Sequence, residues 1–201
     1  MILVSLWQSP TPAGYGIVAS APFYNPGALR TGDVIFRRGR SVVSEIVLTA
    51  DRQGSFSHVG MVLVEAGIPW VVHATPDEPV DTQGAVVREH LNQFLSADRA
   101  SATAVYRASD PVRADHAAAV AADYARRRLP FDAAFDLLTS DNLYCTELVW
   151  RAYLEVGLDL TGGNRDELPI PLGRGLYLLP GTLLSGHLLE AVEQFTNPRM
   201  P

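Results

Sequence analysis

Residues 143–153 read LYCTELVWRAY and contain the only cysteine of the 201-residue chain. Apolar side chains after the cysteine recur at spacings of three and four residues, which predicts one buried face of a helix that ends at Gly157. Asn142 or Asp141 is expected to cap the first turn. Cys145 then falls within that first turn, and its position decides how the rest of the sequence is interpreted.

A cysteine at a helix start lies among unpaired backbone N–H groups and near the positive end of the helix dipole. Both favour the thiolate over the thiol, so the pattern predicts that Cys145 is a nucleophile. Two other interpretations stay open. A lone cysteine is often a small buried hydrophobic residue, and an accessible one can be a regulatory redox thiol.

Two of the five histidines lie where the sequence predicts a hairpin. Segments 57–65 and 70–74 have strand-like composition, with a turn at 66–69. His58 opens the first strand and His73 lies near the end of the second, so antiparallel pairing brings them together. A cysteine nucleophile needs a base and a group that orients the base; we predict these to be His58 and His73.

The register of the hairpin decides whether this pair forms. A shift of one residue would turn His73 to the opposite face and leave Glu65 or Thr75 as the third group. Each histidine also has a plainer role, His58 as a strand cap and His73 as a core residue with satisfied hydrogen bonds. No paired ligands stand at the short spacing of a zinc site, so we expect neither a metal nor an organic cofactor.

Length and composition predict a single globular core, since 47% of the residues are hydrophobic. We divide the chain into an extended lead-in over 1–30, a main domain over 31–160 and a C-terminal extension over 161–201 that packs on it. The net charge of −6 argues against nucleic acid as a partner. The basic runs at 37–40 and 126–128 are interpreted as solvated faces.

No apolar run approaches the roughly 20 residues that a membrane span needs, so no transmembrane segment is expected. Residues 2–7 are apolar, but no basic segment precedes them and prolines soon follow, which does not match a signal peptide. These features favour a cytoplasmic over an exported protein, with a signal that has been removed as the alternative. The sequence sets no oligomeric state.

Four short motifs follow one another along the chain: GDVIF at 32–36, SHVGM at 57–61, VHA at 72–74 and LYCTELV at 143–149. Together they resemble the circularly permuted NlpC-type papain-like amidases, and the YiiX-like branch in particular. In unpermuted members the cysteine helix precedes the other motifs, whereas here it follows them. The resemblance covers about residues 31–157.

This resemblance implies an α+β fold, in which a central antiparallel sheet of five or six strands packs against a helix that carries the cysteine at its N-terminus. It implies that Cys145 is the nucleophile, His58 the base and His73 the third polar residue of a hydrolase that forms a thioester. We expect Tyr144 and Ser57 to contact the substrate or the oxyanion, beside the backbone N–H of Cys145.

The same chemistry fits two substrate classes, an amide in a small or cell-wall-type peptide, and a lipid-like ester handled by an acyltransferase or thioesterase. The lecithin:retinol acyltransferase relatives exemplify the second class. Apolar residues of segment 176–184 would suit an acyl chain or fill the core, and residues 182–194 are predicted to be helical. A non-catalytic binding module on the same fold is the third alternative.

Overall fold

The protein is seen in a computed structural model that describes residues 26–51, 54–76, 84–139, 141–167 and 176–196. The lead-in predicted for residues 1–30 lies outside the described residues as far as residue 25, as do the apolar residues 2–7. Its described end forms a short 3-10 turn, Pro26–Ala28.

The elements follow in the order β1 (Val34–Gly39), α1 (Val42–Ala50), β2 (His58–Glu65), β3 (Ile68–Thr75), β4 (Ala85–His90), α2 (Leu91–Phe94), β5 (Ala100–Ala108), α3 (Pro111–Arg127), α4 (Cys145–Glu155), β6 (Asp166–Glu167), β7 (Leu176–Tyr177), a 3-10 turn (Pro180–Leu184) and β8 (Leu189–Thr196). Six strands form one sheet in the order β4-β3-β2-β1-β5-β8, and every neighbouring pair is antiparallel. The predicted α+β fold with a central antiparallel sheet is confirmed.

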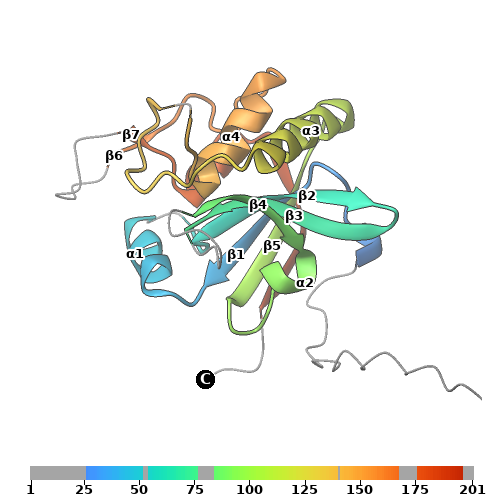
Figure 1. Ribbon diagram of the computed structural model, residues 1–201, viewed down its shortest axis with the longest axis horizontal. Coiled ribbons are helices and arrows are strands. Elements are labelled where there is room, and N and C mark those ends of the chain that lie inside the picture. The colour runs from blue at the N-terminus through green and yellow to red at the C-terminus, as the bar shows by residue number, and fades with distance from the viewer. Residues whose placement is uncertain (1–25, 52–53, 77–83, 140, 168–175, 197–201) are drawn as a thin grey trace, which may run out of the picture.

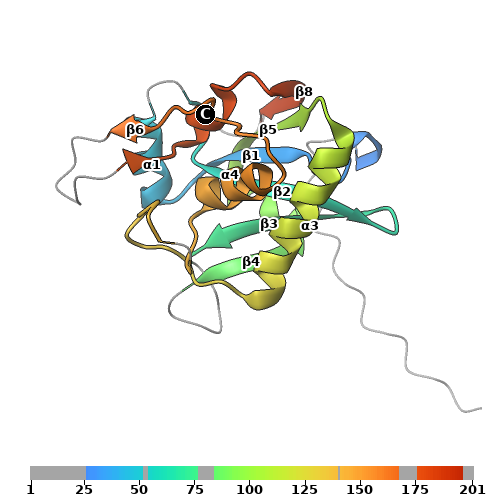
Figure 2. The same ribbon diagram turned by 90° about the horizontal axis from the view of Figure 1, so that it is seen from above.

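Helices α3 and α4 pack side by side on one face of this sheet, and the short helix α2 lies on the other face (Figures 1 and 2). Strand alternation separates two buried clusters. Val34 and Phe36 of β1 join the cluster under α3 and α4, and Ile35 joins the smaller cluster beside α2. The near-continuous apolar run of β1 therefore reflects burial on both faces.

Gly32 brings the start of β1 close to both long helices. Its φ of +87° favours glycine, and a Cβ there would lie 2.6 Å from backbone atoms of Ala114 in α3. The hydroxyl of Tyr153 in α4 donates a hydrogen bond to the carbonyl oxygen of Gly32 at 2.6 Å. The glycine of the GDVIF motif thus allows α3 and α4 to seat on the sheet.

The helix predicted for residues 182–194 is wrong. Residues 180–184 form a single 3-10 turn, and Leu189–Thr196 is strand β8, which pairs with β5 at the edge of the sheet. Leucine, glutamate, alanine and glutamine favour helices, but the unpaired edge of β5 outweighs that local preference. The C-terminal segment therefore completes the central sheet.

None of the described helices is long and apolar enough to cross a membrane.

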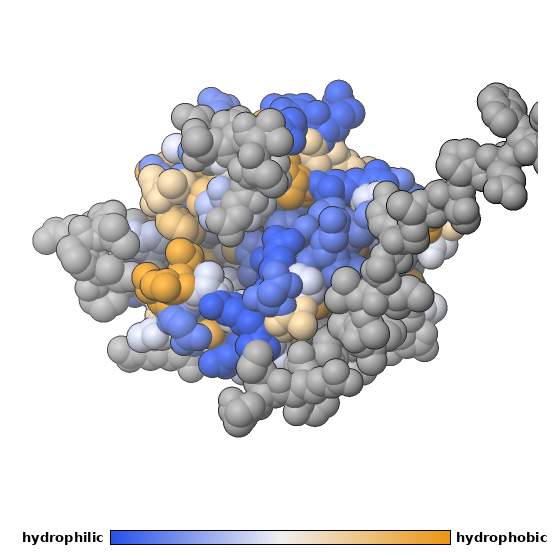
Figure 3. Space-filling model, turned by 60° about the horizontal axis from the view of Figure 1, so that its bottom comes forward, coloured by the Kyte–Doolittle hydropathy of each residue, from blue (hydrophilic) through white to orange (hydrophobic). Residues whose placement is uncertain are grey.

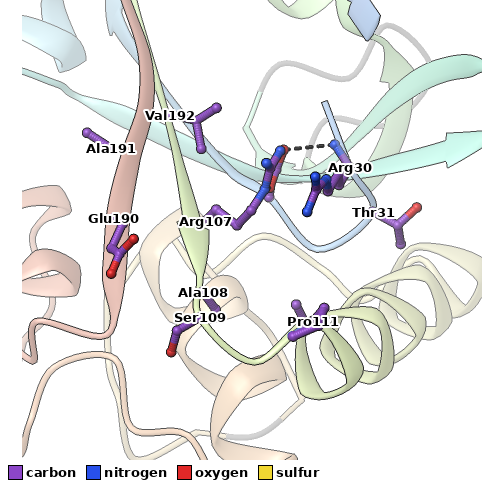
Figure 4. A pocket seen from close by; sticks show the side chains of 11 residues that line it. Arg30, Thr31, Arg107, Ala108, Ser109, Pro111, Glu190, Ala191 and Val192 are labelled. Atoms are coloured by element: carbon purple, nitrogen blue, oxygen red, sulfur yellow. Dashed lines mark hydrogen bonds and ion pairs between the residues drawn. The ribbon is translucent and has the colours of Figure 1, made fainter. Parts of the chain in front are cut away.

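A pocket opens where the start of β1 meets the end of β5, the start of α3 and β8 (Figure 4). In its wall the Arg107 guanidinium forms an ion pair with Asp33, which is only 1% exposed, through two contacts of 2.7 Å. Arg107 also donates to the carbonyl oxygen of Ala28, so this pair ties the entry of the chain to β1 and β5.

Replacing Asp33 with Asn should lower the free energy of unfolding by about 3 kcal/mol, because the Arg107 guanidinium loses its carboxylate partner. The matched control is Asp123→Asn, which breaks an exposed ion pair with Arg126 and should change stability far less than Asp33→Asn, because water screens exposed charges. Urea unfolding followed by circular dichroism measures both variants. Equal effects at the two positions would contradict the role given to Asp33.

Candidate active site

Cys145 is the first residue of α4, as the sequence predicts, but the cap of this helix is a different residue. Tyr144 occupies the N-cap with extended backbone angles and makes no capping hydrogen bond through its side chain. The expectation that Asn142 or Asp141 caps the turn is wrong. The amide of Asn142 instead donates to the buried carboxylate of Asp132, which organises the loop before the helix.

The thiol sulfur lies against the first residues of β2. The backbone N–H groups of Val59 and Thr146 donate hydrogen bonds to it. Pairing between β2 and β3 ends at Met61 and Val72, although both strands continue, so the amide of Val59 lies beyond the last paired residues. This contact holds Cys145 next to the residue that follows His58.

Burial raises the pKa of the Cys145 thiol. The two backbone donors and the positive charge of Arg37 lower that pKa, but they offset the cost of desolvating a thiolate only in part. The start of the helix favours the thiolate as expected, but burial outweighs this effect and the pKa of Cys145 is raised. Cys145 is half-buried and protonated at neutral pH.

His58 and His73 are brought together by the hairpin. The Nε2 atom of His58 lies 2.9 Å from Nδ1 of His73, and the two rings are nearly perpendicular. Gly60 makes room for the pair, since a Cβ there would lie 2.5 Å from a methyl group of Val71 and 3.2 Å from Cβ of His73. The Phe94 ring packs against both imidazoles from α2.

The register leaves Glu65 far from this pair. Glu65 lies seven residues beyond His58 on β2, which corresponds to about 23 Å along a strand. Its exposed carboxylate forms an ion pair with Arg88 at the turn end of the hairpin. The structure thus places His73, and not Glu65, within hydrogen-bond reach of His58.

Glu89 is a residue of the site that the sequence did not reveal. Its carboxylate accepts from Nε2 of His73 at 2.8 Å, and its other oxygen lies 2.7 Å from the Arg99 guanidinium. In β4, Val87 pairs with His73, so Glu89 lies two residues on and on the same face. The composition of residues 85–88 predicts a strand, and extending its alternation by one residue places Glu89 on the face of Val87.

Arg37 is a second residue of the site, although the basic run 37–40 predicts a solvated face. Arg37 is only 8% exposed. It pairs with His58 across β1 and β2, donates to the carbonyl oxygen of Phe94 at 2.7 Å and stacks over the Phe94 ring. Arg37 lies two residues after Ile35 on β1, so both side chains point to the face of the sheet that α2 covers.

Burial and neighbouring cations keep both imidazoles neutral. Desolvation lowers the pKa of His58 well below its ordinary value, and the charges of Arg37, His73 and Arg99 lower it further. Desolvation also lowers the pKa of His73, although Glu89 opposes this. Burial favours the neutral acid at Glu89, but hydrogen bonds and charges from His73 and Arg99 outweigh it and bring its pKa to about 2.

The hydroxyls of Tyr144 and Ser57 are committed to backbone groups beside the site. Tyr144 accepts a hydrogen bond from the N–H of Leu178 at 2.9 Å, and Ser57 accepts one from the N–H of Gly39. Both residues are buried. They connect the segment before β8 and the end of β1 to the positions next to Cys145 and His58.

A family model of permuted papain-like amidases, the YaeF/YiiX C92 family, matches residues 28–163. The chain belongs to this family. The match extends from the turn before β1 to the loop after α4, and so includes Cys145, His58, His73 and Glu89.

Two relatives support the assignment. The uncharacterized protein YiiX of Escherichia coli (strain K12) is 29% identical over 141 residues, which cover 69% of this chain. The chain spans 64% of the length of that curated relative. A crystal structure of YiiX from Escherichia coli O157:H7, described as a metalloprotein, has the same fold with a TM-score of 0.68 at 22% identity, and the match covers 84% of this chain and 98% of that one.

The description of that relative as a metalloprotein raises the question of ligands here. Among the residues whose positions are described, no three histidine, cysteine, aspartate or glutamate side chains gather in a group that could hold a metal ion. Both ring nitrogens of His73 already have partners in His58 and Glu89.

The two buried histidines should make folding less favourable as the pH falls below 6.5, against an opposite contribution from Glu147, whose pKa burial raises to about 7. The pKa values of His58 and His73 are lowered in the folded protein, so the unfolded chain takes up protons that the folded chain does not. Urea unfolding between pH 5 and 8 measures the histidine contribution as the difference between the wild type and the double variant His58→Gln/His73→Gln, which should lose less stability than the wild type as the pH falls. Replacing the exposed His116 with Gln is the control and should leave the slope unchanged.

Proposed function

We propose that this chain is a cysteine hydrolase that cleaves an amide bond in a small or cell-wall-type peptide. Cys145 is the nucleophile, His58 the base and His73 the residue that orients the base. The observation that carries the proposal is the hydrogen bond between His58 and His73 beside a thiol at a helix start. Membership in a family of amidases supports the reaction class.

The neutral state of both groups defines the first step. Because Nε2 of His58 already binds His73, Nδ1 is the nitrogen left to face the thiol. The Cys145 proton passes to Nδ1 as the sulfur attacks the carbonyl carbon, so the attack needs no preformed ion pair. The tetrahedral intermediate then expels the amine, which takes the proton from His58, and leaves a thioester. Water attacks the thioester with His58 as the base and restores the thiol.

The oxyanion is stabilised by the start of α4. The backbone N–H of Cys145 belongs to the first turn, where amides have no partner within the helix. The hydroxyls of Tyr144 and Ser57 already bind backbone groups, so these two buried residues support the segments beside Cys145 and His58 and leave the oxyanion to the backbone N–H.

Replacing Cys145 with Ala should abolish hydrolysis, and His58→Ala should lower kcat by about 10²-fold or more. The substrates are a panel of aminoacyl and dipeptidyl 4-nitroanilides and short cell-wall-type peptides. Alkylation by iodoacetamide between pH 6 and 10 is followed in parallel. Activity that survives Cys145→Ala would overturn the proposal, and alkylation unaffected by His58→Ala would favour a redox thiol or a binding module.

One observation favours lipid-like acyl substrates as the second candidate. Eight large hydrophobic side chains are exposed in the described residues, and five of them belong to segments at the end of the molecule where α4 begins (Figures 1 and 2). These are Val42, Val43, Ile46, Leu138 and Leu176, and we call them the apolar rim. Figure 3 shows a hydrophobic patch at the end of the molecule where α1 lies.

Contacts tie two parts of the rim, the loop of Leu138 and the segment of Leu176, to the residues at the start of α4. Helix α1 directly follows β1, and Ser44 is its buried residue, so most of its apolar side chains face outward. Leu138 lies in the loop whose Phe135 contacts the ring of Tyr144. Leu176 precedes Leu178, which binds the side chains of Tyr144 and Thr146. An acyl chain near Cys145 would find an apolar surface there.

The triple variant Val42→Ser/Val43→Ser/Ile46→Ser separates the two substrate classes. If acyl chains bind the rim, kcat/KM for a long-chain 4-nitrophenyl ester should fall about tenfold or more while that for the acetate ester stays unchanged. Val112→Ser is the control, because Val112 is 62% exposed on α3 and lies outside the rim. Equal losses on both esters would exclude the acyl-chain role of the rim.

A further inference from the structure

A continuous line of side chains extends from His58 away from the thiol. Nε2 of His58 meets Nδ1 of His73 at 2.9 Å, Nε2 of His73 meets Glu89 at 2.8 Å, and the other Glu89 oxygen meets Arg99 at 2.7 Å. These residues come from β2, β3, β4 and the loop before β5. The line is twice as long as a base with one orienting residue requires.

The chemistry at the far end allows only one direction of hydrogen bonding. A guanidinium only donates, and an ionised carboxylate only accepts. With the pKa of Glu89 at about 2, its carboxylate is ionised at neutral pH, so Nε2 of His73 must carry a proton. Since the His73 ring is neutral, its Nδ1 has a lone pair and accepts from His58.

His58 must then carry its proton on Nε2. Its Nδ1 is left with a lone pair, which is the form that can take a proton from Cys145. The opposite tautomer would point an N–H at the sulfur and could not act as the base. The contacts from Arg99 through Glu89 and His73 thus determine that Nδ1 of His58 carries a lone pair and not a proton.

We propose that Glu89 is a positioning residue that fixes the tautomer of His58 through His73. The proposal rests on the function proposed above, in which His58 is the base. It extends that function by a fourth residue, with Arg99 orienting the Glu89 carboxylate. The side chain of His73 is 0% exposed, so bulk water does not compete for its nitrogens and the protein groups set the direction.

The charged groups around the two imidazoles affect whether each ring takes up a second proton. Arg37 and Arg99 both oppose a positive charge on His58. A proton on both nitrogens of His73 would turn its Nδ1 into a donor and reverse the hydrogen bond to His58. Desolvation and the same two arginines disfavour that form, while Glu89 favours it.

Glu89→Gln should reverse the direction of the hydrogen bonds from residue 89 to His73 and from His73 to His58. Arg99 can only donate, so it binds the oxygen of the new amide and leaves the NH₂ group facing His73. His73 then accepts a hydrogen bond at Nε2 and donates one from Nδ1. His58 accepts that hydrogen bond at Nε2, so its own proton lies on Nδ1. Glu89→Asp keeps the carboxylate and should keep the original direction.

The experiment is a long-range ¹H–¹⁵N correlation spectrum of protein labelled with ¹⁵N-histidine, at pH 7.5. The wild type and Glu89→Asp should show His58 protonated at Nε2, and Glu89→Gln should show it protonated at Nδ1. In steady-state kinetics Glu89→Gln should lower kcat by about 10²-fold with little change in KM. Glu65→Gln, at the far end of the same hairpin, is the matched control and should change neither the tautomer of His58 nor kcat.

The spectrum separates this proposal from the proposed function. A wild-type His58 that carries its proton on Nδ1 overturns the role of Glu89, whether or not any variant folds. So does a Glu89→Gln variant with unchanged tautomer and unchanged kcat. If the tautomers are as expected but Cys145→Ala keeps its activity, the proposed function fails while the assignment of the tautomer stands.

Discussion

The site depends on one hydrogen bond, which joins Nε2 of His58 to Nδ1 of His73 and exists only in one register of the β2–β3 hairpin. A slip of one residue would turn His73 to the opposite face of the sheet. The register is held by burial, because Val71 and Val72 occupy different clusters on the two faces and neither can exchange sides without exposing an apolar side chain.

The same sheet brings the cysteine to the histidines from the other face. Helix α4 is held near its end by Tyr153, which donates to Gly32, and at its start by the contact between the sulfur and Val59. The pairing of β2 with β3 ends at Met61, before the strands themselves end, and the sulfur binds an amide in that stretch. The position of the Cys145 sulfur is thus fixed by backbone groups that the pairing of β2 with β3 leaves unused.

Much of this could be predicted from the sequence, because it follows from local patterns. The three- and four-residue spacing of apolar side chains after Cys145 identified the helix and its start. The two strand-like segments around Gly67 identified a hairpin, which was enough to bring His58 and His73 together. Four motifs in permuted order gave the family, which the match over residues 28–163 confirms.

Tertiary structure alone decided the rest, for physical reasons that no local pattern contains. The strand β8 formed because β5 offered an unpaired edge, against the helical preference of residues 182–194. Glu89 entered the site because β4 pairs with β3 in one register, and Arg37 was buried because its face of β1 lies under α2. The protonation of Cys145 followed from burial, which outweighed the helix start. Local sequence determined the helix that begins at Cys145, the β2–β3 hairpin and the groups they carry. Strand pairing across the fold decided the last strand and the place of Glu89, and desolvation decided the protonation of the buried groups.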